Sequence, residues 1–179
     1  MRNMAIGIFV SFLIIALLQP LIEASNLMKD KVVLGSAILN SCRAARNNAL
    51  STVDYYVYDG EELIIGNLSA FLEEKEFCAF FAEAFCETLG VDLIGPSENP
   101  MIFDGNGLWN KITVDIELEF DKGAYPDTEQ FENRGVGKVI VNVETPYLFR
   151  TSLLKTFVEI TGGEYTIKET RVFLVQIIN

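Results

Sequence analysis

Residues 4–22 read MAIGIFVSFLIIALLQPLI and contain no charged residue over 19 positions. As an α-helix this stretch spans about 28 Å, close to the roughly 30 Å of a bilayer's hydrocarbon core. A cleaved secretory signal has a shorter apolar region, of about 7 to 15 residues, followed by a small-x-small site. We therefore expect a transmembrane anchor over residues 1–24. A signal peptide removed before Ser25 is the alternative.

The apolar pattern continues beyond this stretch with helical spacing. One stripe recurs at steps of four, four, three and four, and consists of Leu34, Ile38, Cys42, Ala45 and Ala49. No proline follows Pro20 before residue 50. We therefore expect one helix from residue 4 to about 50, roughly 70 Å long, whose part over residues 25–50 leaves the membrane as a long amphipathic helix. The alternative is two helices broken near Ser25 and Asn26.

Small residues on this helix mark a surface that another helix can approach closely. They are Gly35, Ala37, Ala44 and Ala45. Ala45 also belongs to the apolar stripe, so the competing interpretation is that the helix packs against its own domain. Pro20 and Glu23 lie at the outer end of the apolar stretch, where proline bends a helix and a carboxylate is cheaper than at the bilayer centre. Glu23 either reaches the membrane surface or contacts a neighbouring subunit.

The amino-acid composition excludes several classes of function. The chain has 179 residues, of which 50% are hydrophobic and 22% charged, a net charge of −11 and no histidine. About one folded domain is expected at this length, and the acidic surface repels nucleic acid. Without histidine there are no Ser-His-Asp or Cys-His centres and no histidine-ligated zinc. We therefore expect a non-enzymatic protein with no catalytic, cofactor-binding or metal-binding residues, and no nucleic-acid partner.

Residues 51–179 predict a small outer α+β domain. Residues 53–58 and 62–65 have the composition of a hairpin around Asp59-Gly60. Asn67 or Ser69 can begin a helix that runs to Leu89, with Phe71, Leu72, Cys78, Phe81, Phe85 and Leu89 as its apolar stripe. Residues 94–111 are rich in glycine, proline and asparagine and predict a loop.

The second half of this domain contains a clear alternation of apolar and polar residues. In residues 112–120 apolar residues alternate with polar or acidic ones, which indicates a strand with one face buried and an acidic face in water. A turn-rich connection over 121–137 leads to a second strand predicted over residues 138–145. A short helix over 147–157 and a closing strand over 165–178 are predicted to follow. The fold class is therefore α+β with a mostly antiparallel sheet.

The cysteines leave two alternatives. Cys42, Cys78 and Cys86 have no metal-binding spacing. On one helix, Cys78 and Cys86 would lie about 12 Å apart along the axis, too far for a disulfide. Cys42 can pair with either of them if the two helices pack together. The sequence therefore leaves two alternatives, a disulfide that involves Cys42 or three buried free thiols.

Two stretches resemble one family. The apolar span, then Ile22-Glu23, then the helix ending LNSCRAARNNA at residues 39–49, resembles the start of the TadE-like minor pilins of tight-adherence (Flp-type) pilus systems. The tail resembles the same family: VIVNVET, PYLFR at residues 146–150, Leu153-Leu154, a Gly-Gly pair and a closing strand.

The resemblance implies a minor pilin-like (pseudopilin) component of a pilus or related secretion apparatus that acts through helix–helix assembly. Its implied partners are the lipid bilayer and other pilins or pilus-assembly membrane proteins. A long domain is translocated largely regardless of its charge, so we expect a single-pass protein of the cell membrane with its C-terminal domain outside the cytoplasm. The alternative is a solitary membrane-tethered binding or sensor domain.

Overall fold

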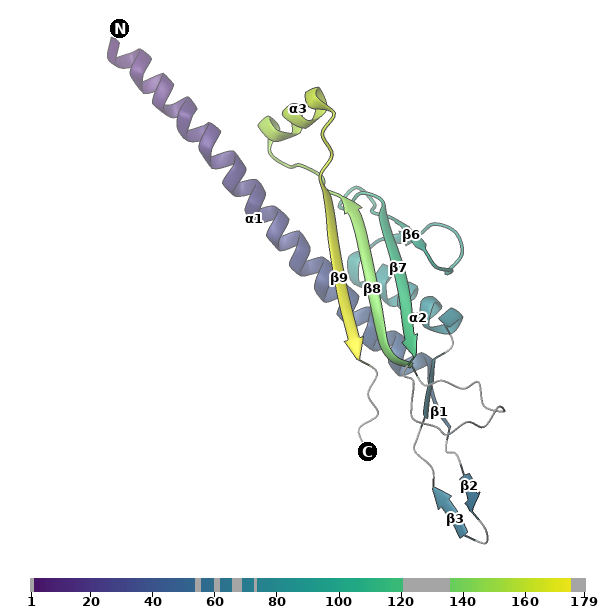
Figure 1. Ribbon diagram of the computed structural model, residues 1–179. Helices are drawn as coiled ribbons and strands as arrows, with labels where there is room; N and C mark the ends of the chain where they lie inside the picture. The colour runs from purple at the N-terminus through teal and green to yellow at the C-terminus, as the bar shows by residue number, and fades with distance from the viewer. Residues whose placement is uncertain are drawn as a thin grey trace.

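A long helix carries a small outer domain at its C-terminal half (Figure 1). The computed structural model describes residues 2–53, 56–59, 62–65, 69–72, 74–120 and 136–174. Its helices are α1 (Arg2–Ala49), α2 (Glu74–Leu89) and α3 (Ser152–Thr161). Its strands are β1 (Leu50–Val53), β2 (Tyr56–Asp59), β3 (Glu62–Ile65), β4 (Ser69–Leu72), β5 (Asp92–Leu93), β6 (Met101–Asp104), β7 (Ile112–Phe120), β8 (Val136–Pro146) and β9 (Thr166–Leu174).

The predicted α+β class is confirmed. Strands β5 to β9 form a five-stranded antiparallel sheet in chain order. Two smaller antiparallel pairs, β1 with β4 and β2 with β3, follow α1 along the chain. The expected pairing of residues 53–58 with residues 62–65 is therefore confirmed between Tyr56–Asp59 and Glu62–Ile65. Val53 belongs to β1 instead, and residues 54 and 55 lie outside the described part of the chain.

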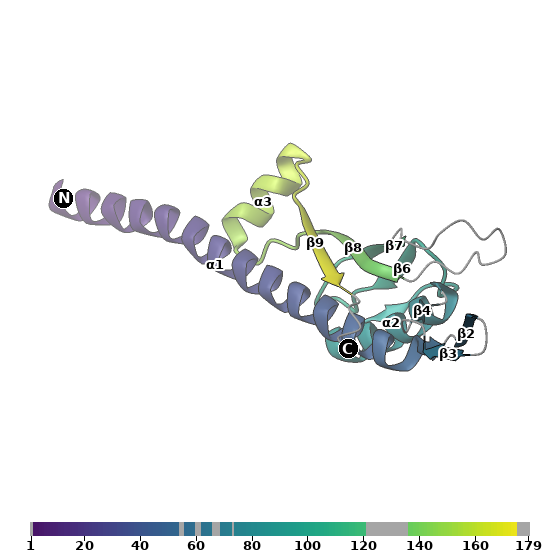
Figure 2. The same cartoon turned by 60° about the horizontal axis from the view of Figure 1, so that its bottom comes forward.

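α1 is continuous over 48 residues, so the expectation of one long helix is confirmed and the alternative of two helices is wrong. Pro20 lies inside the helix with its ring exposed. A proline lacks only its own N–H, so it removes a single rung from the helical hydrogen-bond ladder. Figures 1 and 2 show the N-terminal half of α1 projecting away from the sheet.

The core lies between the C-terminal half of α1, helix α2 and one face of the sheet. The predicted stripe on α1 is buried at every position: Leu34, Ile38, Cys42, Ala45 and Ala49. The bulk comes from α2 and β6, where the rings of Phe77, Phe81, Phe85 and Phe103 follow one another at centroid distances of 5.0 to 6.5 Å. Such aromatic stacking adds to area burial, and it fixes α2 against the sheet.

The opposite face of the sheet has the expected polar character. Ile112, Val114 and Ile116 of β7 are buried, whereas Glu117 and Glu119 are exposed. Glu119 pairs with Lys138 of β8 at 2.9 Å. Alternation in residues 112–120 therefore predicted both the strand and its solvated face correctly.

Helix α2 begins later than expected. Residues 69–72 form β4 and pair with β1 directly after the end of α1, so Phe71 and Leu72 do not belong to the stripe of α2. The helix begins at Glu74, and Glu74 and Glu76 place negative charge in its first turn. Local sequence favoured helix here, but pairing with β1 competes with it.

Two further segments differ from the sequence prediction. Residues 101–104 form β6, with Met101 and Phe103 buried, although a four-residue strand between glycines and prolines reads as loop. The helix expected over 147–157 is α3, which ends at Gly162 with φ 64°. It starts later because residues 147–151 contact α1 instead. The closing strand is described to Leu174, and the rest of the range predicted for it lies outside the described residues, as does the connection over 121–135.

Candidate functional site

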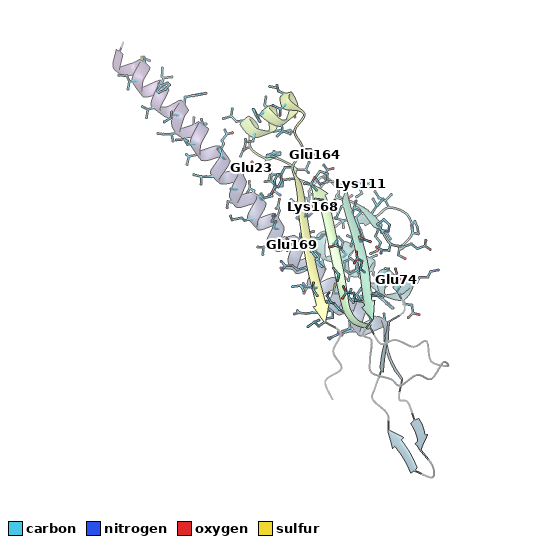
Figure 3. The ribbon with its side chains drawn as sticks, in the orientation of Figure 1. Glu23, Glu74, Lys111, Glu164, Lys168 and Glu169 are labelled. Carbon is cyan, nitrogen blue, oxygen red and sulfur yellow. The ribbon has the colours of Figure 1, made fainter. Side chains whose placement is uncertain are left out.

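The buried side of α1 is apolar from Leu34 to the C-terminal end of the helix. Toward the N-terminus it becomes polar, just before the charge-free stretch of residues 4–22. Gln19, Glu23 and Asp30 are one and two turns apart, so they share a face of the helix with Leu34. All three bind the segment from Tyr147 to Leu153 that joins β8 to α3. We call these contacts the junction. Figure 3 labels Glu23 where this segment passes α1.

Glu23 is the centre of the junction. Its side chain is 4% exposed, and its two carboxylate oxygens accept three hydrogen bonds. The Tyr147 hydroxyl donates to Oε1 at 2.7 Å and the Arg150 backbone N–H donates to the same oxygen at 2.9 Å. The Thr151 N–H donates to Oε2 at 2.9 Å. A buried carboxylate is stable only with such donors, because an unpaired buried charge is costly.

Asp30 holds the same segment two turns further along α1. Nη2 of Arg150 lies 2.9 Å from Oδ1 and 2.7 Å from Oδ2 of Asp30. The aspartate side chain is 10% exposed and the arginine side chain is 44% exposed. Because one partner reaches water, this ion pair contributes at most about 1 kcal/mol to stability. Asp30 therefore orients Arg150 more than it stabilises the fold.

Gln19 contacts the first turn of α3. Its Oε1 accepts the N–H of Leu153 at 3.0 Å. Thr151 is the N-cap residue of α3 and makes no side-chain cap hydrogen bond of its own. The first N–H groups of a helix need acceptors from outside the helix. In this structure α1 supplies two of these acceptors, Gln19 for the Leu153 N–H and Glu23 for the Thr151 N–H.

Tyr147 connects the junction to the sheet. Burial and the adjacent Glu23 carboxylate raise the pKa of the Tyr147 hydroxyl, so it stays protonated and donates to Glu23. Its ring meets Phe149 and Tyr165 edge to face, and its N–H donates to the Tyr165 carbonyl at 2.7 Å. The position of Glu23 is thus linked to the start of β9.

Most of the small residues predicted as an assembly surface are buried in the chain's own domain. Ala37 and Ala45 are fully buried, Gly35 is buried and Ala44 is half-buried. A Cβ at Gly35 would lie 2.5 Å from Nη2 of Arg171 on β9, so the glycine provides room for this guanidinium. Gly35, Ala37 and Ala45 therefore pack within their own chain, as in the competing interpretation, and their contact with a helix of another subunit stays a prediction.

The other predicted site residues have different surroundings. Pro20 is exposed, and the Glu23 carboxylate accepts hydrogen bonds from its own chain, whereas its predicted contact with the membrane surface or a neighbouring subunit stays a prediction. Cys42, Cys78 and Cys86 are free thiols, the first two buried and the third half-buried. Burial, reinforced by Glu74, raises the pKa of Cys78 to about 11. A thiol with so little thiolate at neutral pH is a poor nucleophile.

The junction has the chemistry of a structural contact. Every oxygen of the Glu23 carboxylate has a donor within the chain, and Asp30 is paired with Arg150. Within the described residues, no group of three or more His, Cys, Asp or Glu could hold a metal ion. The arrangement holds residues 147–153 and the first turn of α3 against α1.

Comparison with known proteins adds no relative. No family model matches the chain, and neither a curated protein nor a solved structure is significantly similar to it.

Sequence reasoning missed the partners of Glu23. A signal was present, because Asp30, Glu23 and Gln19 continue the stripe of Leu34 at steps of four, seven and four. Acidic residues on the extension of a buried stripe require donors elsewhere in the chain. Two of these donors are backbone N–H groups, which no residue type reveals. The side-chain partners are the Tyr147 hydroxyl, which donates to Glu23, and the Arg150 guanidinium, which donates to Asp30.

Proposed function

We propose that this protein is a membrane-anchored, non-enzymatic minor pilin-like (pseudopilin) component of a tight-adherence pilus or related secretion apparatus. In this proposal α1 crosses the membrane once and the outer domain lies outside the cytoplasm. The observation that carries the proposal is the division of α1. One helix is long and apolar enough to cross a membrane, and the most apolar part of it contacts no core of the protein.

Exposed apolar side chains on the outer part of α1 support assembly with other helices. Leu21, Met28 and Val32 follow one another at steps of seven and four and are all exposed. They lie on the side of α1 opposite the stripe of Glu23 and Leu34, so the outer domain does not cover them. We call them the outer ridge. It extends about 15 Å beyond residue 22, further than the bilayer core accounts for.

The second candidate is a solitary membrane-tethered domain. The observation that favours it is the burial of Gly35, Ala37 and Ala45 inside the domain, because this removes the small-residue surface from assembly. The two candidates differ in what contacts the outer ridge. In an assembly it is another helix, and in a solitary domain it is solvent and the lipid headgroups.

Photo-crosslinking in the cells that make the protein separates the candidates. A photoreactive amino acid at Val32 should crosslink the full chain to other membrane-anchored subunits of the apparatus. The same group at Glu117, on the exposed face of β7, is the matched control and should give few such products. Val32→Glu should reduce crosslinking from a photoreactive group at Met28 without changing the melting temperature. Lipid adducts alone at Val32 would contradict the proposal and favour the solitary domain.

A further inference from the structure

Helix α3 has an apolar edge that nothing in the described chain covers. Leu153, Phe157 and Ile160 lie at steps of four and three, so they share one side of the helix. They are 44%, 61% and 79% exposed, and no residue of α3 is buried. Lys155 and Glu159 lie together on another side. In water, a ten-residue helix with such an edge requires an apolar partner.

The level of α3 along α1 is fixed by hydrogen bonds. The Leu153 N–H binds Gln19, which belongs to the charge-free stretch and lies about 4.5 Å before its end at Ile22. In Figures 1 and 2, α3 extends away from α1 to one side rather than along it. It is also the element of the outer domain nearest the projecting half of α1 (Figure 1). A helix that extends sideways from a membrane-crossing anchor at this level would lie along the membrane surface.

We propose that α3 is an interfacial helix that lies in the outer surface of the membrane, with Leu153, Phe157 and Ile160 inserted among the lipid chains. This inference rests on the proposed crossing of the membrane by α1. Amphipathic helices of this kind bury their apolar face about 5 to 10 Å into the boundary between headgroups and acyl chains. The end of α3 at Gln19 matches that depth.

Lipid fits this edge better than a second copy of the chain does. Leu18 and Ile22 of α1 lie within one turn of Gln19 and are themselves exposed and apolar, so lipid at this level would contact α1 as well as α3. α3 carries one lysine and one glutamate. Its attraction to the membrane is therefore apolar rather than electrostatic, and a zwitterionic surface is sufficient.

The proposed contact gives the outer domain a second attachment to the membrane. α1 alone leaves the domain free to rotate and tilt about one point. α3 lying on the surface removes this freedom, and Gln19 and Glu23 transmit the constraint to β8 and β9 through residues 147–153. In the proposed apparatus this would present the outer ridge of α1 to its neighbours at a constant angle.

Quenching by brominated lipids tests the inference on the full chain. Trp109 is replaced by Phe, and one tryptophan is introduced at Phe157, at Lys155 or at Leu13 of α1. Each variant is reconstituted into phosphatidylcholine vesicles whose acyl chains carry bromine at a shallow position or at a deep one. Phe157→Trp should lose at least about half of its fluorescence to the shallow bromines and less to the deep ones. Lys155→Trp, on the polar side, should lose little.

The Leu13→Trp variant separates the two proposals. Strong quenching at residue 13 by deep bromines with none at residue 157 would overturn the interfacial helix and leave the anchor intact. Absence of quenching at both positions would overturn the anchor, and the interfacial helix with it. Blue-shifted but unquenched fluorescence at residue 157 that varies with the protein-to-lipid ratio would show contact with a second copy, which also overturns the lipid assignment.

Discussion

The two halves of α1 are one continuous helix, yet their surfaces differ. Residues 4–22 carry exposed apolar side chains on all sides. Residues 23–49 bury one stripe, which is polar at Glu23 and Asp30 and apolar from Leu34 onward. A helix that is apolar all round matches lipid, whereas a striped helix matches a protein core with water outside. The junction lies where one pattern replaces the other.

Two matched isoleucine substitutions, one in each half of α1, should show the largest difference between the two halves. Ile38 is fully buried and Ile14 is exposed. Ile38→Asp puts an unpaired charge in the core and should lower the free energy of unfolding of the outer domain by more than about 4 kcal/mol. Ile14→Asp should leave that free energy unchanged but disfavour membrane insertion by about 2.5 to 3.5 kcal/mol. Near-ultraviolet circular dichroism in detergent and membrane fractionation measure the two effects. Equal destabilisation by both changes would contradict the division.

Glu23→Gln should have the next largest effect. An amide offers one acceptor oxygen instead of two, and its NH₂ would face either Thr151 N–H or Arg150 N–H. We expect a loss of up to about 3 kcal/mol in the free energy of unfolding. Glu117→Gln, on the exposed face of β7, is the control and should stay within about 0.5 kcal/mol. A stable Glu23→Gln chain would mean that residues 147–151 are held by other contacts.

Ala45→Leu tests which interpretation of the small residues holds. Ala45 has no exposed surface, so leucine overfills the core and should cost about 1 to 2 kcal/mol despite its good helix propensity. Ala24→Leu, at an exposed position on the same helix, should change stability by less than about 0.5 kcal/mol. The melting temperature of the full chain in detergent measures both. Unchanged melting with lost crosslinks would instead restore Ala45 to an assembly surface.

The smallest expected effect concerns Asp30 and Arg150. A double-mutant cycle with Asp30→Asn and Arg150→Gln should give a coupling of at most about 1 kcal/mol, because Arg150 is partly exposed. High salt should reduce this coupling further, since dissolved ions screen a pair that is open to water. A much larger coupling that salt leaves unchanged would show that the pair is buried in the membrane-bound protein.

Patterns that repeat over many residues predicted the fold well. The helix through Pro20, the stripe from Leu34 to Ala49 and the alternation in 112–120 each rest on several turns or strand steps, so single residues do not alter them. The short elements β4 and β6 were missed because four residues carry too little periodicity to compete with local helix and loop composition.

The site was predicted less well than the fold. The small side chains at Gly35, Ala37 and Ala45 indicate only that another element packs closely against α1. The sequence does not say whether that element belongs to the same chain or to another subunit. The sequence singled out Glu23, but for a contact with a subunit or the membrane surface, which stays a prediction. Its donors lie more than 120 residues away, and two are backbone groups, so only the folded chain brings them together.

Membrane extraction combined with determination of the N-terminal residue tests most directly whether the first half of α1 lies in lipid. Membranes from cells that make the full chain are washed with high salt and then with alkaline carbonate. The 19 uncharged residues bury too much apolar surface for peripheral binding, so we predict that the intact chain stays in the membrane pellet. An intact soluble form that begins at Ser25 would contradict the account, because it would show that the exposed half of α1 is removed rather than retained as an anchor.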